Sequence, residues 1–369
     1  MGKTVTIYDI AREAGVSAAT VSRVLTGKAK VSEGKREKIE RLIREYDYKP
    51  NALARSLRET KSRVIGMVLV DFVNPFYASL LSICEKEARK RGYSLIVTGT
   101  LGDRELEDQY LDTMYEQRVA AIVMVGGRTD ELAVDMEYVE HVNRIANSVP
   151  IVIGGQLNGA DCCKVNLDES RAAEIAVEYL LKLGHREIAF VGGSKDVRST
   201  MEKRLKYMQI LQKNNISVRK EWIVDGEGYD DQSGYEAMQQ ILNLSSKPTA
   251  VIAVNDFTAA GAVHAILDRG LRIPEDISVI SFDDTYIGNL CRPRLTSVSY
   301  DLERFGEVLI HSAVGIVEGG KIKQNQLIKP KIIVRDSCKK MIGGGVKWKK
   351  LYYKKIKSDK NCIYLQKRD

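Results

Sequence analysis

The feature that most constrains the fold is a stretch near the amino terminus that predicts two short helices in immediate succession. In Thr6–Ala14 the apolar residues recur at intervals of three and four, which places them on one face of a helix of about two turns. Thr6 is suited to cap the start of this helix, and Gly15 is suited to end it in a left-handed conformation. Ser17 then opens a second helix, which extends to Leu25. This spacing predicts a helix-turn-helix.

The outward face of the second helix has the chemistry of a DNA-reading surface. It carries short side chains, hydroxyls and one guanidinium, on Ser17, Ala18, Ala19, Thr20, Ser22 and Arg23. A face this thin fits the major groove, where an arginine can hold the edge of a guanine with two hydrogen bonds. We therefore expect these residues, together with Thr6, to contact DNA. The alternative is an ordinary helical hairpin inside a globular domain.

The distribution of charge agrees with a nucleic-acid partner. The chain has 57 Lys and Arg against 49 Asp and Glu, a net charge of +8. Residues 1–60 contribute +5 and residues 339–369 contribute +9, which leaves −6 for residues 61–338. A basic amino-terminal module is typical of phosphate binding, whereas DNA would repel the acidic middle part.

Two further segments carry a resemblance to a known family. Val31-Ser32 opens a third helix that we expect to end near Tyr46, with Ser32 as its cap, and Tyr48-Lys-Pro-Asn-Ala-Leu-Ala-Arg-Ser-Leu57 comes after it. With the helix-turn-helix, these segments resemble the headpiece of the lactose/galactose repressor family of bacterial transcription regulators, and most of all its catabolite control branch. The resemblance extends to Ser337. It implies a homodimer that represses genes from a pseudo-palindromic operator under the control of a sugar or sugar phosphate.

The resemblance also assigns a hinge helix to the segment after the third helix. The segment from Asn51 to Leu57 is too short to form a stable helix alone in water. In the family it orders on DNA, and a leucine that matches Leu57 is wedged into the minor groove, where it unstacks the central base step. We therefore expect Asn51 and Leu57 to contact DNA. Without the resemblance, Leu57 would be an apolar residue of a linker.

From residue 63 onward, short apolar runs alternate with helical segments. The runs predict buried strands at 64–70, 94–97, 121–125, 150–153, 187–191, 249–254 and 277–282. The first series also predicts helices at about 76–92, 103–117 and 130–147. Strands that alternate with helices form parallel sheets covered on both faces. The two series predict a two-lobed α/β domain like that of periplasmic binding proteins, with one doubly wound sheet in each lobe.

These patterns divide the chain into four expected parts. They are a headpiece at 1–49, a hinge helix and linker at 50–62, an effector-binding and dimerisation domain at 63–337, and a basic tail at 338–369. We expect the first lobe at about 63–162 and 292–321, and the second at about 163–291 and 322–337. The tail has the composition of a disordered segment, with the alternative that it strengthens nonspecific DNA binding. It has no leucine heptad, so no tetramerising coiled coil is predicted.

The residues just after the strands are candidates for a ligand site, because open parallel sheets bind ligands at the carboxyl ends of their strands. Carboxylates and amides suit vicinal hydroxyls, and aromatic rings suit the apolar face of a sugar. The loops that carry these groups resemble the effector-contacting loops of the family. The candidate effector-binding residues are Asp71, Phe76, Tyr77, Arg204, Asn255 and Asp283. Taken singly, each is also a typical capping or turn residue.

Two positions depart from the family pattern. The family shows Arg-x-x-Gly-aromatic where this chain has Arg204-Leu-Lys-Tyr207, as though one residue were missing. A deletion inside a helix rotates the residues beyond it by about 100°. We therefore expect Arg204 or Tyr207 to be displaced. Ser281 also replaces the family's usual glycine before an aromatic residue.

Other functional classes find little support in the sequence. The six cysteines lack metal-site spacing, the glycine pairs form neither a dinucleotide-binding nor a phosphate-binding loop, and the four histidines stand beside no nucleophile motif. We expect neither an enzyme nor a bound cofactor or metal. The chain has no apolar run of 18 residues and no signal-peptide pattern, so we expect a cytoplasmic protein with no membrane partner.

Two non-enzymatic alternatives to a sugar-operon repressor remain. A sugar-binding transport component shares the two-lobed architecture, but it needs export and has no use for a headpiece. A global catabolite regulator would instead use a phosphorylated phosphocarrier protein as corepressor. The segment Cys291-Arg-Pro-Arg-Leu-Thr-Ser-Val298 is similar to that branch of the family, so the phosphocarrier protein remains an alternative partner.

Overall fold

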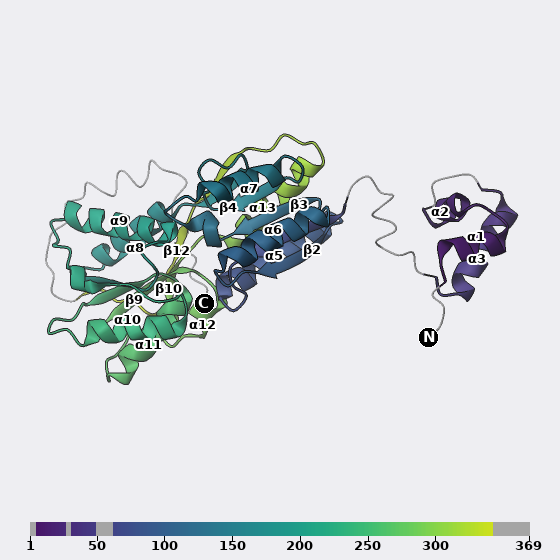
Figure 1. The fold of residues 1–369 in the computed structure, drawn as a ribbon. Helices are drawn as coiled ribbons and strands as arrows, with labels where there is room; N and C mark the ends of the chain where they lie inside the picture. Colours follow the sequence, from purple (N-terminus) through teal and green to yellow (C-terminus); the bar gives the residue numbers. More distant parts are fainter. Residues whose placement is uncertain (1–4, 27–30, 49–61, 342–369) are drawn as a thin grey trace, which may run out of the picture. The chain divides into compact units, whose positions relative to one another are not determined.

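The structure is a computed structural model, and the residues that it describes are 5–26, 31–48 and 62–341. Between Ser62 and Arg63 it divides into a small helical unit and a large α/β unit, which are drawn in Figure 1. Of the predicted hinge and linker only Ser62 is described, so Asn51 and Leu57 lie outside the described residues. Among the described helices, none combines the length and the apolar character that a membrane span needs.

Three helices form the small unit: α1 (Ile7–Ala14), α2 (Ala18–Thr26) and α3 (Glu33–Glu45). The predicted helix-turn-helix and the third helix are confirmed. The apolar stripes of all three helices meet in one small core. Its buried members are Ile10, Ala11, Ala14, Val21, Ile39 and Leu42.

The ends of these helices have the expected caps with one exception. The side-chain oxygen of Thr6 accepts a hydrogen bond from the backbone N–H of Asp9, whose carboxylate in turn accepts one from the backbone N–H of Thr6 at 3.0 Å. Gly15 ends α1 with a φ of 70°, the left-handed conformation expected of it. Ser32 is the N-cap residue of α3, as expected, but its side chain makes no capping hydrogen bond.

The first lobe of the large unit is built on a six-stranded sheet in the order β11-β5-β4-β3-β1-β2, in which all neighbours run parallel. Its strands are β1 (Val64–Leu69), β2 (Ser94–Gly99), β3 (Ala121–Val125), β4 (Ile151–Gly154), β5 (Cys163–Leu167) and β11 (Asn325–Ile328). Two helices cover each face, so both faces are buried in separate apolar clusters. The pairs are α5 (Pro75–Lys90) with α13 (Leu302–Val317), and α6 (Arg104–Glu116) with α7 (Met136–Ala146).

The second lobe repeats this plan with the strand order β12-β10-β9-β8-β6-β7. Its strands are β6 (Ile188–Val191), β7 (Ile223–Val224), β8 (Ala250–Ala253), β9 (Ser278–Asp283), β10 (Thr296–Ser299) and β12 (Lys331–Ile333). Only the edge strand β12 runs antiparallel to its neighbour in the described sheet. The covering helices are α8 (Glu169–Lys182) with α9 (Arg198–Lys213) on one face, and α10 (Asp231–Leu242) with α11 (Asp256–Asp268) on the other. The short helix η2 (Lys220–Trp222) precedes β7, and α12 (Tyr286–Leu290) comes after β9.

The chain passes between the two lobes three times, after β5, after β10 and after β11. The expected lobe boundaries are therefore wrong at three strands. Strands β5 and β11, expected in the second lobe, pair with each other and extend the first sheet. Strand β10, expected in the first lobe, pairs with β9 of the second sheet. Both β5 and β10 mix polar with apolar residues, so neither produced an apolar run in the sequence.

The helix expected at 130–147 is interrupted. A short helix, η1 (Gly127–Asp130), comes after β3, and α7 begins only at Met136. The carboxylate of Asp135 accepts hydrogen bonds from the backbone N–H groups of Glu137 at 3.1 Å and Tyr138 at 3.3 Å. This side-chain cap satisfies amides that a continuous helix would have bonded within itself, and it sets the start of α7.

The first four residues of the tail that was predicted to be disordered are part of the described structure. Residues 338–341 pack against the second lobe, where the backbone N–H of Lys339 donates to Ser278 Oγ at 3.1 Å and that of Met341 donates to the carbonyl of Leu183 at 2.8 Å. His185 also binds the Lys339 carbonyl through Nε2 at 3.1 Å. The remainder of the tail lies outside the described residues.

Asp256, the first residue of α11, is a buried carboxylate surrounded by hydrogen-bond donors. It accepts from Ser281 Oγ at 2.5 Å, from Ser297 Oγ at 2.8 Å, and from both the hydroxyl and the backbone N–H of Thr285 at 3.0 and 2.6 Å. This network accounts for Ser281, which replaces the glycine of the family pattern. Its hydroxyl is directed into the lobe and is satisfied there.

We predict that Asp256 makes the stability of the protein depend on pH. Burial raises its pKa from an ordinary value of 3.8 to about 6, although the hydrogen bonds from Ser281, Ser297 and Thr285 lower it. Between these two values the folded protein binds the proton more tightly than the unfolded chain. The resulting stabilisation is complete below the ordinary pKa and is lost as the pH rises through the folded-state pKa.

The variant Asp256→Asn lacks this titration and serves as the reference. The free energy of unfolding of the wild type minus that of the variant should be larger at pH 5 than at pH 7 by about 1.4 kcal/mol. Urea unfolding at both pH values measures this difference. A constant difference would mean that the carboxylate is already ionised at pH 5.

Candidate functional site

Helix α2 presents most of the residues that the sequence assigned to DNA contact. The exposed or half-buried members are Ser17, Ala19, Thr20, Ser22 and Arg23. Ser17 caps the helix, because its Oγ accepts from the backbone N–H of Thr20 at 3.3 Å and lies 3.0 Å from the Thr20 hydroxyl. Ala18 is half-buried like Thr20 and Ser22, and it also packs against the core of the small unit.

Two residues at the start of α1, Thr6 and Tyr8, are also exposed on the surface of the small unit. The hydroxyl of Thr6 donates to the Asp9 carboxylate at 2.6 Å, so its geometry is fixed by the cap. Tyr8 is 71% exposed and was missed in the sequence.

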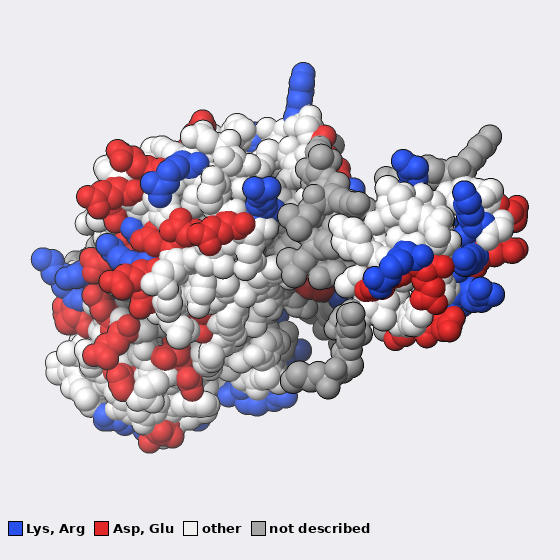
Figure 2. All heavy atoms as spheres, turned by 45° about the vertical axis from the view of Figure 1, so that its right-hand side comes forward, with Lys and Arg blue, Asp and Glu red and all other residues white. Residues whose placement is uncertain are grey.

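The charges of the two units can be compared on their surfaces. Figure 2 shows acidic side chains spread widely over the visible face of the large unit, and both basic and acidic side chains on the small helical unit. The described residues of the small unit carry seven Lys and Arg and seven Asp and Glu, so the net positive charge of residues 1–60 comes from residues outside the described ranges. The acidic face of the large unit disfavours phosphate binding.

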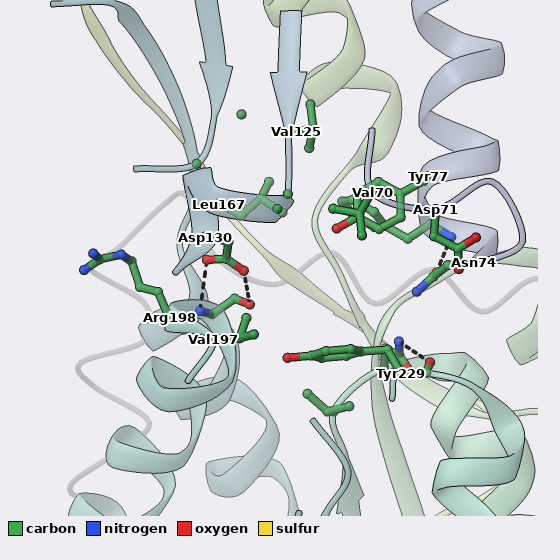
Figure 3. Close-up of a pocket in the computed structure, with 18 of the residues that line it drawn as sticks. Val70, Asp71, Asn74, Tyr77, Val125, Asp130, Leu167, Val197, Arg198 and Tyr229 are labelled. Carbon is green, nitrogen blue, oxygen red and sulfur yellow. Dashed lines mark hydrogen bonds between the residues drawn. The ribbon is translucent and has the colours of Figure 1, made fainter. Parts of the chain in front are cut away.

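The large unit contains a cavity of about 720 Å³ between its lobes. Its walls are loops at the carboxyl ends of β1, β3 and β4 in the first sheet, and of β8 and β9 in the second. The strand order reverses between β1 and β3 and again between β6 and β8, and such reversals open a crevice in doubly wound sheets. Figure 3 shows side chains of both lobes facing this space. The volume suits a small molecule.

Most of the candidate effector-binding residues lie in the walls of this cavity. The ones that line it are Asp71, Phe76, Tyr77, Asn255 and Asp283. Asn255 also supports the wall, because its side chain accepts from the backbone N–H of Thr258 at 2.7 Å and donates to the carbonyl of Tyr229 at 3.0 Å. The rule that ligands bind beyond the carboxyl ends of parallel strands therefore located the cavity correctly.

Arg204 is the exception and is not in the cavity wall. It is 4% exposed, and its guanidinium donates to Asp225 at 2.5 Å and to the carbonyls of Gly192 and Gly193 at 2.9 Å. These contacts direct the side chain into the second lobe. The expectation that Arg204 reaches the ligand site is corrected accordingly.

Lys203, one residue earlier, lines the cavity instead. It stands four positions before Tyr207, which is the spacing between the arginine and the aromatic residue in the family pattern Arg-x-x-Gly-aromatic. Tyr207 is buried, and its hydroxyl donates to the carbonyl of Ile188 at 2.7 Å. Lys203 and Tyr207 thus keep the spacing of the arginine and the aromatic residue of the family pattern, and Arg204 is the one of the two expected residues that is displaced from the cavity.

Lys203 belongs to a buried cluster at the junction of the lobes. Its Nζ lies 2.8 Å from Glu169 Oε2, and the hydroxyl of Tyr300 donates to the same carboxylate. Glu169 lies just after the first passage between the lobes, and Tyr300 lies in the second. The cluster of Lys203, Glu169 and Tyr300 thus joins helix α9, the cavity wall and two of the three passages.

The lobes also touch directly at another wall of the cavity. Asp130 of the first lobe accepts hydrogen bonds from the backbone N–H and the hydroxyl of Ser199 of the second, at 3.1 and 2.5 Å, as Figure 3 shows. Nearby, the backbone N–H of Leu132 donates to the carbonyl of Asp196 at 3.1 Å. Burial raises the pKa of Asp130 to about 6, although the Ser199 hydroxyl lowers it.

Asp283 has an unusual backbone and an unpaired side chain. It ends β9 with a φ of 93°, a region that residues other than glycine rarely adopt and that is often associated with functional sites. No described residue donates a hydrogen bond to its carboxylate, which lines the cavity. Burial raises its pKa well above the usual range, and only the charge of Lys203 works against this.

Acidic residues outnumber basic ones in the cavity wall. The first lobe contributes Asp71, Glu107, Asp130 and Glu131, and the second contributes Glu202, Asp230, Asp231 and Asp283, with Glu169 at the junction. The basic residues of the wall are Arg128, Arg198 and Lys203. Most of these charged residues were not predicted from the sequence, because the loops that carry them lie far apart in the chain. The wall also contains Tyr229, whose ring extends into the space in Figure 3.

Comparison with known proteins matches both units. The family model of bacterial regulatory proteins of the lacI family matches residues 6–51, and the periplasmic binding protein-like domain matches residues 177–338. Catabolite control protein A of Priestia megaterium is 36% identical over 82% of this chain and 90% of its own length. The HTH-type transcriptional repressor PurR of Klebsiella pneumoniae subsp. pneumoniae is 32% identical over 90% of this chain and 96% of its own.

Solved structures agree with the sequence matches. The lac repressor dimer bound to operator and an anti-inducer superposes with a TM-score of 0.81 at 27% identity, over 91% of this chain and all of the other. A complex of the transcriptional regulator CelR with cellobiose superposes with a TM-score of 0.67 at 25% identity, over 90% of this chain and 99% of the other. With the helix-turn-helix and the two-lobed unit in the same order, these matches show that the chain belongs to the lacI family of bacterial regulatory proteins.

Proposed function

We propose that this protein is a transcription repressor that binds a pseudo-palindromic operator as a homodimer and responds to a small polar effector in the cavity of its large unit. One observation carries the proposal: a single chain combines a helix-turn-helix with a narrow exposed recognition face and a two-lobed unit with a cavity between its lobes. The genes it controls are those for use of a sugar-like compound. It acts on chromosomal DNA in the cytoplasm.

Helix α2 reads the operator half-site. Its exposed side chains are short apart from Arg23, so the backbone of the helix can come close to the floor of the major groove. Ala19 offers only a methyl group, which suits the methyl of a thymine. Most of the hydrogen-bonded discrimination between bases therefore falls to Arg23. Thr6 and Tyr8 contact the backbone of the DNA, where they fix the register.

Control passes through the two lobes. A ligand in the cavity touches both lobes, so it favours the lobe arrangement in which its contacts are best. It can change operator affinity only by the difference between its affinities for the two arrangements. Two solved relatives support this part of the proposal. One is described as bound to its operator and to an anti-inducer, and the other is described as a complex with cellobiose. The first is also described as a dimer.

A sugar-binding transport component is the main competitor in a different class. It shares the two-lobed architecture and the cavity. It would have no use for the capped helix-turn-helix, nor for the basic charge of residues 1–60. Salt-dependent retention on DNA separates the two functions, because only a regulator should show it.

We predict that Arg23→Ala weakens operator binding by about 1–3 kcal/mol and relaxes the preference at one base position. The operator is first selected from a pool of random duplexes with the wild-type protein, and affinities are then measured by gel shift on this operator and on random DNA. Arg41→Ala is the matched control, since it removes the same charge from an exposed position on α3. Arg41→Ala should weaken binding to the operator and binding to random DNA by equal amounts.

Equal losses of affinity for random DNA and for the operator in Arg23→Ala would contradict the proposal that Arg23 discriminates between bases. The proposal that the protein is a DNA-binding regulator is contradicted before any variant is made, if the wild type binds no duplex at moderate ionic strength with or without candidate metabolites. The two outcomes are distinct because selection of the operator precedes the use of any variant.

A second candidate function is favoured by the relatives. Several of the most similar curated proteins are catabolite control proteins, including that of Staphylococcus xylosus at 33% identity over 83% of this chain. In this version a phosphorylated phosphocarrier protein acts as corepressor. We predict that the serine-phosphorylated carrier would then tighten operator binding by about tenfold, within the usual range of allosteric coupling. The unphosphorylated carrier is the control, and no response to either would leave a local repressor governed by the cavity.

A further inference from the structure

The charges that line the cavity restrict the chemistry of its ligand. Nine carboxylates and three cations stand in the wall. Only Glu131 and Glu169 have an ion-pair partner within 4.0 Å among the described residues, namely Arg104 and Lys203. The other seven carboxylates have no ion-pair partner within 4.0 Å among the described residues. Burial raises the pKa of Glu107, Asp130, Glu202 and Asp283, which favours their neutral forms, but the carboxylates still outnumber the cations of the wall.

The three cations of the wall are already bound to acceptors of the protein. Arg128 lies 2.8 Å from both Asp108 and Asp135. Lys203 is paired with Glu169. Arg198 has no ion-pair partner among the described residues. One guanidinium nitrogen donates to the carbonyl of Glu131 at 3.2 Å, its Nε has no hydrogen-bond partner, and in Figure 3 the group points away from the centre of the cavity. A phosphate group at the centre of the cavity would therefore meet two paired cations and one that is turned away, and it would have to approach the more numerous carboxylates.

Among the residues of the wall, Asp283 gives the most specific indication of the group that the ligand carries. Its carboxylate is held in the wall by a backbone with a φ of 93°, and no described residue donates to it. The side chain is half-buried, and a partly desolvated carboxylate without a donor is costly, so a ligand that donates to it gains more than it would from a satisfied group. Burial raises the pKa of Asp283, and a positive charge beside it would reverse that effect. Asp130, which also lines the cavity, has a raised pKa for the same reason.

The remaining wall suits the rest of a small polar molecule. The rings of Tyr77 and Tyr229 extend toward the space in Figure 3, where they offer faces to a sugar ring and to a cation. Asp71 and Asn74, at the end of β1 and the start of α5, bring further oxygen and nitrogen atoms to the same space. The hydroxyl groups of a ligand can form hydrogen bonds with these atoms.

We infer that the effector is a small polyhydroxyl compound that carries a protonated amine, of the amino-sugar class, and that its ammonium group binds at Asp283. This inference rests on the proposed function and makes it more specific. It separates the ligand from sugar phosphates, which the surplus of carboxylates repels, and from neutral sugars, which gain nothing from the charge.

The test compares isosteric ligands that differ in charge. Glucosamine and galactosamine, their parent sugars glucose and galactose, and the two 6-phosphates are added to the full-length protein, and binding is measured by the rise in melting temperature and by calorimetry. We expect the better amino sugar to bind at least about tenfold more tightly than its parent, as one additional close charge pair allows. The 6-phosphates should bind more weakly than the parents.

Two variants locate the preference. Asp283→Asn keeps the size of the side chain and removes the charge, so it should reduce the advantage of the amino sugar to about threefold or less. Asp336→Asn is the matched control, because it removes a carboxylate from an exposed ion pair with Arg294 outside the cavity wall. It should leave the advantage unchanged. Circular dichroism of both variants confirms that they are folded.

Three results would overturn the inference. These are equal or tighter binding of the parent sugar, tighter binding of a 6-phosphate, and no response to either amino sugar. An undiminished advantage in Asp283→Asn would overturn the assigned position of the ammonium. Operator binding is measured separately on the same samples. Intact operator binding with the wrong ligand preference refutes the inference alone, whereas absent operator binding refutes the proposed function.

Discussion

The triple passage of the chain between the two sheets is the constraint on which the rest of the large unit depends. Because β11 returns to the first sheet before β12 joins the second, each sheet is completed by a strand that reaches it through a passage. Any movement of one lobe against the other must therefore be absorbed in three short segments, which is the usual construction of a hinge. The cavity lies between the lobes that this hinge joins.

The cluster of Lys203, Glu169 and Tyr300 connects the cavity to this hinge. The carboxylate of Glu169 is shared between an ammonium group on α9 and a phenol in the second passage. A buried ion pair of this kind is held by mutual geometry, since removal of either partner leaves an uncompensated charge. Because Lys203 also lines the cavity, this cluster connects a residue of the cavity wall directly to two of the three passages.

The sequence predicted the central strands well and the strands beside the passages poorly. Strands β3, β6 and β8 are buried along their whole length and consist of apolar residues, so their runs were visible. Strand β10 is also buried, but three of its four residues carry hydroxyls, one of which donates to Asp256, 41 positions away in the chain. A partner so distant in sequence cannot be inferred from local hydropathy.

The site was predictable where it obeys a general rule and unpredictable where it depends on the direction of a side chain. Residues after the strands were found because the carboxyl ends of parallel strands share an edge. The sequence pattern placed Arg204 at the cavity, but Lys203 lines it. Adjacent residues on a helix point about 100° apart, so which of the two faces the cavity depends on how the helix is rotated. The buried Tyr207 helps to fix that rotation, and the motif alone does not reveal which residues are buried.

The contact between Asp130 and Ser199 has a consequence for how the lobes can move. Its hydrogen bonds join the lobes beside the cavity, so the lobes cannot part on that side without breaking them. A molecule that favours parted lobes must offset the loss of these bonds, whereas one that favours the joined arrangement keeps them.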